Sequence, residues 1–355
     1  MLFAGWDVQK NTLRLMPAAL LLLSGCADLG YYWQSVHGQT QIWQKEKPIT
    51  ELLEDSTTPL ELKQKLAMVL RLRDFASGEL ALPDNGSYRA YADLERPFVV
   101  WNVFAAPEFS IRPREWCFPV AGCVAYRGYF SRAEAEAFSE KLRQQGFDVY
   151  VGGVPAYSTL GWFSDPVLNT FAHYPETEIA RLLFHEMAHQ RYYLAGDTEF
   201  NESFATVVEQ EGLARWVRRY GSEAQLATMA DARKKKSEFI SLVLQYRGRL
   251  EQVYATAVDD QQKRAAKAAA LEQMQQDYAQ LKRSWDGYSA YDRWFATPPN
   301  NAQLASVAAY GRWVTAFQAL LTKNDGDFAR FYQAVKDIGS LPREERMERL
   351  EHLAN

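Results

Sequence analysis

The string His185-Glu186-Met187-Ala188-His189 constrains the fold of this chain more than any other feature. Side chains four residues apart lie above one another on an α-helix, so the two imidazoles share one direction when the stretch is helical. Its surroundings favour a helix, because Pro175 suits a first turn and an apolar stripe runs through residues 179–187. The sequence therefore predicts a helix that begins near Pro175 and stops by Gly196.

This spacing is typical of zinc hydrolases. His185 and His189 can ligate one Zn²⁺, while Glu186 can reach a water in the open coordination position and take its proton. The alternative is a chance occurrence, with Glu186 solvated and both histidines simply packed. The helix context and an acidic helix downstream favour the metal interpretation.

A third ligand is expected from residues 198–209, which read as a second helix after a short turn. Glu202 is the predicted ligand, and His, His and Glu leave a catalytic position open on the metal. Glu209 lies two turns later on roughly the same face, so it could instead be the ligand or hydrogen-bond to a ligating imidazole. Asp197 could also serve in that hydrogen-bonding role.

Several longer strings resemble the bacterial putative aminopeptidase family of HExxH lipoproteins. The likeness begins near Gly30 and covers nearly the whole mature chain, through residues 117–130, 157–166, 184–190, 196–205 and 300–304. The resemblance implies a gluzincin-like, zinc-dependent peptidase. In it His185 and His189 are ligands, Glu186 is the base and Glu202 is the third ligand.

The N-terminus predicts a lipoprotein signal peptide over residues 1–25. Lys10 and Arg14 are basic, residues 15–23 are apolar but too short to span a bilayer, and Leu-Ser-Gly precedes Cys26. Lipid attached to Cys26 would tether the protein to a membrane of the bacterial cell envelope. By analogy, the following Ala27 suggests the periplasmic face of the outer membrane. The alternative is an uncleaved apolar anchor with an incidental cysteine.

The other two cysteines, Cys117 and Cys123, form an even pair in a predicted oxidising compartment. Either a disulfide or two free buried thiols fits a separation of six residues. A cysteine-based zinc site lacks further ligands in this region.

The overall prediction is a predominantly helical α+β fold, with a zincin-like catalytic region over residues 26–225 that contains a small sheet. Expected strands cover residues 97–105, 123–130 and 147–152, and Ser131 and Glu134 open a helix with a capping box. Two helices are expected near residues 48–78. Peptide substrate would pair with a sheet edge near residues 149–158.

Residues 226–355 are expected to be helical and to pack on the core. The stretch from Ala224 to Ser284 is charged and Gly-poor, which predicts a long helical hairpin with solvated outer faces. Asn300 or Asn301 can cap a helix that runs through Tyr310 to Leu321, and a further pair of helices follows. The net charge of −4 and the lack of a basic domain argue against nucleic-acid binding.

The expected substrate is a peptide. An aminopeptidase needs a carboxylate for the substrate's α-amino group, and nothing ranks Glu178, Glu199 and Glu209 for that task. An endopeptidase, including one that acts on cell-wall peptides, needs no such anchor. A lipid-tethered scaffold with a structural zinc is the non-enzymatic alternative. Tyrosines that could stabilise an oxyanion are Tyr157, Tyr192, Tyr193 and Tyr310.

Overall fold

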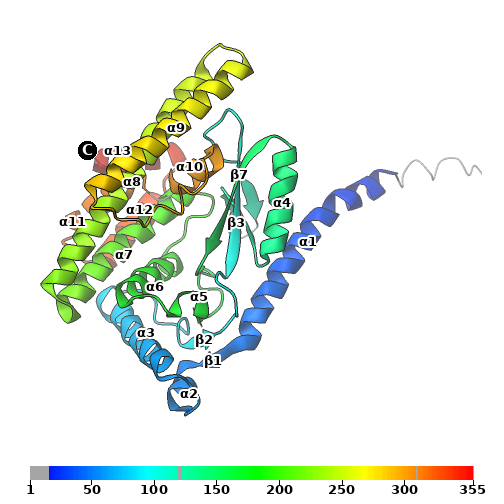
Figure 1. Cartoon of the computed structure of the whole chain (residues 1–355). Coiled ribbons are helices and arrows are strands. Elements are labelled where there is room, and N and C mark those ends of the chain that lie inside the picture. The colour runs from blue at the N-terminus through cyan, green and yellow to red at the C-terminus, as the bar shows by residue number, and fades with distance from the viewer. Residues whose placement is uncertain (1–15, 119–121, 309–310, 355) are drawn as a thin grey trace, which may run out of the picture. The chain divides into compact units, whose positions relative to one another are not determined.

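The computed structural model describes residues 16–118, 122–308 and 311–354. The chain divides into two compact units, with the boundary between Lys45 and Glu46. The first unit contains one described helix, α1 (Met16–Lys45), drawn in blue in Figure 1. It runs through Cys26, while residues 1–15 lie outside the described part, so cleavage and lipidation stay predictions. Among the described helices, none is both long and apolar enough to cross a membrane.

The second unit begins with a small sheet and two helices. Strand β1 (Glu46–Pro48) pairs antiparallel with β2 (Ala90–Ala92), which pairs parallel with β8 (Val167–Leu168). Two helices, α2 (Ile49–Glu54) and α3 (Leu60–Glu79), follow β1 and precede β2 in the sequence. These are the two helices that apolar spacing predicts near residues 48–78.

A three-stranded antiparallel sheet follows, in the order β6, β3, β7. Its strands are β6 (Arg127–Tyr129), β3 (Val100–Pro107) and β7 (Phe147–Val154). Helix α4 (Arg132–Gln144) connects β6 to β7, and Ser131 Oγ accepts from Glu134 N at 3.3 Å as its cap. This is one of the two hydrogen bonds of the predicted capping box; the described hydrogen bonds do not include the second. Side chains alternate along β3, so Phe104 and Ala106 share the face that packs on Ala302. Both β3 and β7 also contact α4 (Figure 1).

The predicted strand over residues 123–130 is wrong in one respect, because it is two strands in different sheets. Its first part is β5 (Gly122–Val124), which pairs with β4 (Trp116–Phe118), whereas β6 pairs with β3. The register places Cys117 opposite Cys123, and a disulfide joins them. The crosslink joins β5 to β4 in a sheet separate from that of β3.

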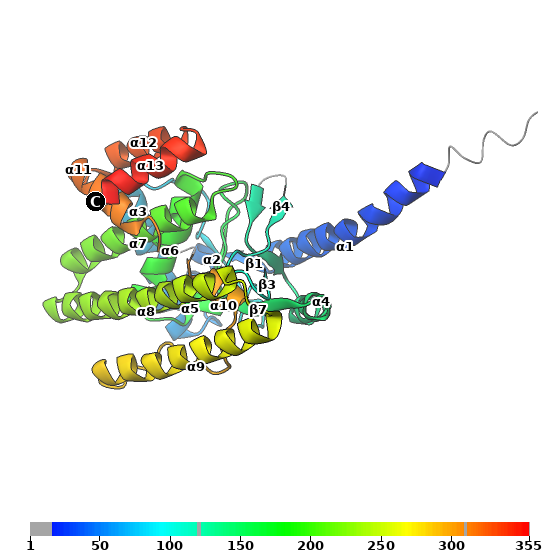
Figure 2. The same cartoon turned by 90° about the horizontal axis from the view of Figure 1, so that it is seen from above.

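Helices dominate the rest of the unit. Short α5 (Asn169–Ala172) leads into α6 (Glu176–Arg191) and α7 (Thr198–Tyr220), which pack against each other. They are followed by the predicted helical hairpin, α8 (Glu223–Ala255) and α9 (Asp260–Ser284), which lie side by side in both views (Figures 1 and 2).

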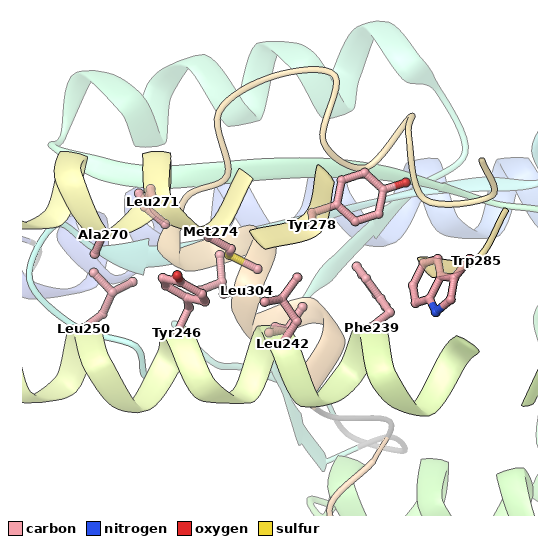
Figure 3. Close-up of a cluster of buried hydrophobic side chains, with 11 residues drawn as sticks. Phe239, Leu242, Tyr246, Leu250, Ala270, Leu271, Met274, Tyr278, Trp285 and Leu304 are labelled. Atoms are coloured by element: carbon pink, nitrogen blue, oxygen red, sulfur yellow. The ribbon is translucent and has the colours of Figure 1, made fainter. Parts of the chain in front are cut away.

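A cluster of apolar side chains fills the space between α8 and α9 (Figure 3). Leu250 and Val243 of α8 and Met274 of α9 are fully buried in it. Ser222 forms a capping box with Gln225 at the start of α8, and Asp259 caps α9. Polar contacts sit at the cluster's margin, such as Tyr246 Oη to Asp277 Oδ2 at 2.6 Å.

The last four helices are α10 (Asn301–Ala308), α11 (Val314–Lys323), α12 (Phe328–Gly339) and α13 (Arg343–Ala354). The final pair is as predicted, but the single helix expected from Asn301 to Leu321 is wrong. Residues 311–313 form a turn, so α11 starts afresh at Val314. The predicted catalytic and C-terminal regions pack together, since α7 contacts both α8 and α11.

Candidate metal centre

Helices α6 and α7 form the hairpin that carries the HExxH string. Pro175 precedes the first residue of α6, and Glu176 and Glu178 lie in the first turn, where the helix dipole favours acids. The helix ends at Arg191, earlier than predicted, and Gly196 lies in the following turn at φ +80°. Asn201 closes that turn, with hydrogen bonds of 2.8 Å to both the N and O of Leu194.

The disulfide-linked β4–β5 hairpin packs directly on this turn. A Cβ at Gly122 would lie 2.5 Å from the Gly196 nitrogen, so only glycine permits the approach. Gly122 also has a φ of +73°, which favours glycine for its backbone alone. The turn between the two helices is therefore held from outside as well as by Asn201.

The three predicted metal ligands meet between α6 and α7. His185 Nε2 lies 3.1 Å from Glu202 Oε2 and 3.2 Å from His189 Nε2. His189 Nε2 lies 3.8 Å from Glu202 Oε1. One ligand atom from each residue falls within 4.8 Å of the others, an arrangement that is compatible with a bound metal ion.

Glu209 lies behind His185, on its other ring nitrogen. Its Oε2 is 2.8 Å from His185 Nδ1, while Nε2 of the same ring faces Glu202. Glu209 is 2% exposed, and two cations approach it: Arg181 Nη1 at 3.4 Å and Lys236 Nζ at 3.6 Å. The sequence allows Glu209 to be either a metal ligand or a hydrogen-bond partner of a ligating histidine. The structure shows the hydrogen bond to a histidine.

Asp197 does not share this role. Its carboxylate caps α7 by accepting from Phe200 N at 3.1 Å, and it pairs with Arg346 Nη2 at 2.9 Å. As the N-cap residue, Asp197 lies at the end of α7, whereas Glu202 and Glu209 lie further along the helix, on the face that meets α6. The candidate for an imidazole partner is therefore Glu209.

The two histidines have different surroundings. His189 Nδ1 is buried without a hydrogen-bond partner among the described residues, whereas His185 Nδ1 has Glu209. The ring of Tyr193 lies edge-on to His189, with centroids 6.2 Å apart. Burial lowers the pKa of His189 to about 4. Burial acts the same way on His185, but Glu202 and Glu209 outweigh it and raise that pKa to about 10.

The carboxylates show the matching pattern. Burial works against ionisation of Glu209, yet Arg181, Lys236 and His185 lower its pKa to about 2. Glu186 has no such set of cations. Burial, with the charges of Glu202 and Asp165, raises the pKa of Glu186 to about 7 against the opposing effect of His185. A carboxylate with a pKa near neutral is suited to accept and release a proton.

A polar network that the sequence analysis missed adjoins the C-terminal end of α6. Gln190, next to His189, donates to Asp165 Oδ2 at 2.8 Å and to Ser87 Oγ at 3.1 Å. Asp165 N also donates to Ser87 Oγ at 3.1 Å. Asp165 stands inside the string 157–166 on which the family resemblance rests, so that string was the available signal.

The other candidates from the sequence lie apart or in different contacts. Tyr192 packs on Phe200 and Phe204, and Tyr157 is half-buried and lies edge-on to Phe130. Tyr310 lies outside the described residues. Of the four tyrosines proposed for an oxyanion, the structure places Tyr193 against a histidine of the triad.

Comparison with known proteins gives one match. A family model described as putative aminopeptidase covers residues 30–350. The chain belongs to that family. Its membership supports a peptidase activity. Neither curated proteins nor solved structures match this aminopeptidase-family chain.

Proposed function

We propose that this chain is a zinc-dependent aminopeptidase of the bacterial cell envelope. The observation that carries the proposal is the meeting of His185, His189 and Glu202 in one cluster, on a helix that also bears Glu186. Two imidazole nitrogens and one carboxylate oxygen are the protein ligands of many catalytic zinc sites, and they leave a coordination position for water. The family match supports the choice of a peptide as substrate.

The hydrogen-bond partner of a predicted ligand also fits a zinc site. A ligating imidazole commonly donates its other N–H to a carboxylate, which fixes the tautomer and turns the free lone pair toward the metal. Glu209, held ionised by Arg181 and Lys236, accepts that hydrogen bond from His185 Nδ1. Nε2 of His185 lies toward Glu202 and His189, so the proton that zinc would displace on binding is the one on Nε2.

The protein's own groups can carry out the proton transfers of peptide hydrolysis. Zinc bound to the triad would polarise the scissile carbonyl and lower the pKa of the attacking water. Glu186 accepts a proton from that water as its oxygen bonds to the carbonyl carbon. Glu186 then delivers the proton to the amine as the C–N bond breaks. Its pKa near 7 suits both steps.

The test compares the soluble protein from residue 27 onward with its Glu186→Gln variant. Both are loaded with zinc and given a pool of peptides with free and N-acetylated N-termini, which is read by mass spectrometry. Glu186→Gln keeps the size of the side chain and removes the base, so zinc content should be equal while turnover falls by about 10²- to 10⁴-fold. Trimming of free N-termini by the unmutated protein alone supports the proposal.

Two other results would change the assignment. Internal cuts in acetylated peptides would make the protein an endopeptidase. If both proteins bind zinc and neither cuts any peptide, a non-catalytic role is supported instead.

We propose in addition that Cys26 carries a lipid anchor. The basis is the short apolar run that ends in Leu-Ser-Gly before Cys26. Cells that express the full chain are labelled with a fatty acid that bears a clickable tag. The label should enter the wild type and be lost in Cys26→Ser. A label that persists in the variant contradicts the anchor.

A further inference from the structure

The carboxylates that the sequence offers for a substrate's α-ammonium group are all paired with cations of the protein. Glu178 Oε2 lies 3.1 Å from Arg181 Nε, and Glu199 Oε2 lies 2.9 Å from Arg312 Nη1. Glu209 is contacted by Arg181, Lys236 and His185. A substrate ammonium group would bind weakly to a carboxylate whose charge is already paired with a cation of the protein.

Asp165 differs from these three. It is 5% exposed, and its described hydrogen-bond donors are all uncharged. Gln190 Nε2 donates to Oδ2 at 2.8 Å, the backbone N of Thr159 lies 3.2 Å from both oxygens, and Ser158 Oγ lies 3.4 Å from Oδ2. Among the described residues, no lysine or arginine forms an ion pair with it.

A buried carboxylate without a counter-ion is costly unless another group supplies the positive charge. The pKa of Asp165 is accordingly raised by burial, although its hydrogen bonds oppose the shift. The charge is close to the catalytic region, because Asp165 contributes to the raised pKa of Glu186 and bonds to the neighbour of His189. A cation that bound to Asp165 would lie near Gln190, the residue that follows the predicted ligand His189.

Tyr88 supplies an independent sign of a missing partner. It is 1% exposed, and its hydroxyl has no hydrogen-bond partner among the described residues. Its backbone N donates to the Asp165 carbonyl at 2.6 Å. Burial, then Asp165, then Glu186 raise the pKa of Tyr88, so its hydroxyl lies within electrostatic reach of both carboxylates.

The backbone of Tyr88 also carries strain. Its φ is +61°, in a region that residues other than glycine rarely adopt, and bulky residues least of all. Such strain costs about 1–3 kcal/mol and is concentrated at functional sites. Tyr88 therefore combines a strained backbone, which is hydrogen-bonded to the backbone of Asp165, with a buried hydroxyl that has no partner among the described residues.

We propose that Asp165 and the Tyr88 hydroxyl form the subsite that receives the α-ammonium group of the peptide's N-terminal residue. This inference rests on the proposed function and deepens it. The ammonium donates to the carboxylate, which gains its counter-ion, and to the phenol oxygen, which gains its partner. A peptide with an acetylated N-terminus brings no charge and leaves Asp165 unpaired, so the subsite selects free N-termini.

The test uses Asp165→Asn, which removes the charge and keeps the size of the side chain and an acceptor for Thr159 N. The kcat/KM for a peptide with a free N-terminus should fall at least about 30-fold, as for the loss of one partner of a buried charge pair. Any residual removal of the N-acetylated terminal residue should be unchanged. Ser158→Ala is the matched control, because it removes a donor to Asp165 but leaves the charge.

A second readout does not depend on turnover. In the Glu186→Gln background, calorimetry measures binding of the free and acetylated forms of one peptide. The preference for the free form should disappear when Asp165→Asn is added. Tyr88→Phe, which removes only the hydroxyl, should weaken binding of the free form about 10- to 100-fold, as for one hydrogen bond with a charged donor. This variant keeps the proposal testable if Asp165→Asn does not fold.

The two proposals fail in different ways. If the protein trims peptides and Asp165→Asn lowers activity on both forms equally, Asp165 only supports its loop, and the subsite is refuted while the peptidase stands. An unchanged preference in both Asp165→Asn and Tyr88→Phe also refutes the subsite. If nothing is cleaved but the free peptide still binds through Asp165, the subsite stands and the peptidase assignment falls.

Discussion

The second unit contains two pairs of packed helices, α6–α7 and α8–α9, whose interfaces differ in polarity. Between α8 and α9, the interface is a cluster of buried and mostly apolar side chains (Figure 3). Between α6 and α7, the interface buries His189 and Glu209 and half-buries His185 and Glu202. Both pairs are joined by short turns with capped helix ends.

From this difference we infer that the α8–α9 pair serves stability and that the α6–α7 pair serves the proposed chemistry. Buried ionisable groups are weak contributors to stability, and apolar residues of similar size often stabilise a fold more. The α6–α7 interface keeps its charges and is held instead by Asn201 and by the β4–β5 hairpin that packs on the turn. Local departures of this kind from efficient packing are expected at functional sites.

An ion pair is among the contacts that connect the two helix pairs. Lys236 of α8 reaches Glu209 of α7 at 3.6 Å, and Glu209 contacts His185. The stabilising pair therefore supplies a charge to the pair that holds the predicted metal ligands.

The largest effect is expected from loss of a metal ligand. Glu202→Gln removes an anionic ligand oxygen. Loss of a residue that only hydrogen-bonds to a ligand lowers metal affinity by up to about 100-fold, so loss of this ligand should lower zinc affinity by far more. Competition with a chromogenic chelator measures it. Glu199→Gln, on the same helix but paired with Arg312, is the control. Equal zinc affinity in Glu202→Gln and wild type would place the metal elsewhere.

Truncation in the apolar pair should affect stability alone. Leu250 is fully buried, so Leu250→Ala should lower the free energy of unfolding by about 2–5 kcal/mol. Leu244→Ala, at a position that is 43% exposed on the same helix, should change it by less than about 0.5 kcal/mol. Urea unfolding of the metal-free protein measures both. Loss of zinc from folded Leu250→Ala would show that the two pairs are not separate in role.

Removal of the outer carboxylate should have an intermediate effect. Glu209→Gln keeps the shape but no longer holds the His185 tautomer through a charged acceptor, so zinc affinity should fall about 10- to 100-fold. The chelator competition at pH 7 measures the change. An unchanged affinity would mean that the 2.8 Å contact with His185 does not orient the ligand.

Zinc affinity should rise with pH. The pKa of His185 is about 10 in the metal-free protein, so below that pH zinc must displace a proton from this ring. Affinity should therefore increase about tenfold per pH unit between pH 6 and 8. In Glu209→Gln the slope should be shallower, because one of the groups that raise this pKa is gone. A flat profile in the wild type would contradict the raised pKa.

The smallest effect is expected from the contact between the two pairs. Lys236 is 38% exposed and 3.6 Å from Glu209, so Lys236→Gln should weaken zinc binding by less than about 1 kcal/mol. Lys234→Gln, which removes a neighbouring cation that faces Glu238, is the matched control. A loss as large as that of Glu209→Gln would make Lys236 part of the site itself.

Local signals predicted much of the α6–α7 pair and of the α8–α9 pair. The four-residue histidine spacing places both imidazoles on one face, and the position of Glu202 early in the next helix brings it opposite them. The cap at Ser131 and the charged hairpin from residue 224 also followed from short-range patterns. Each of these depends on neighbours within one or two helical turns.

Contacts across long stretches of sequence were not predictable in this way. Asp165 meets Ser87 across 78 residues, through loops without periodic pattern. Lys236 lies in a lysine run that is typical of a solvated face, and only tertiary packing directs it to Glu209. The strand expected over residues 123–130 was divided because its first residues pair with Cys117 and its neighbours.

X-ray absorption at the zinc edge tests the central claim most directly. The wild-type protein is loaded with one equivalent of zinc. Two imidazole nitrogens at about 2.0–2.1 Å and carboxylate or water oxygens at about 2.0–2.2 Å are predicted. In His189→Gln, one imidazole contribution should be lost. Sulfur at about 2.3 Å, or a wild-type spectrum without imidazole, would contradict a zinc centre formed by His185, His189 and Glu202.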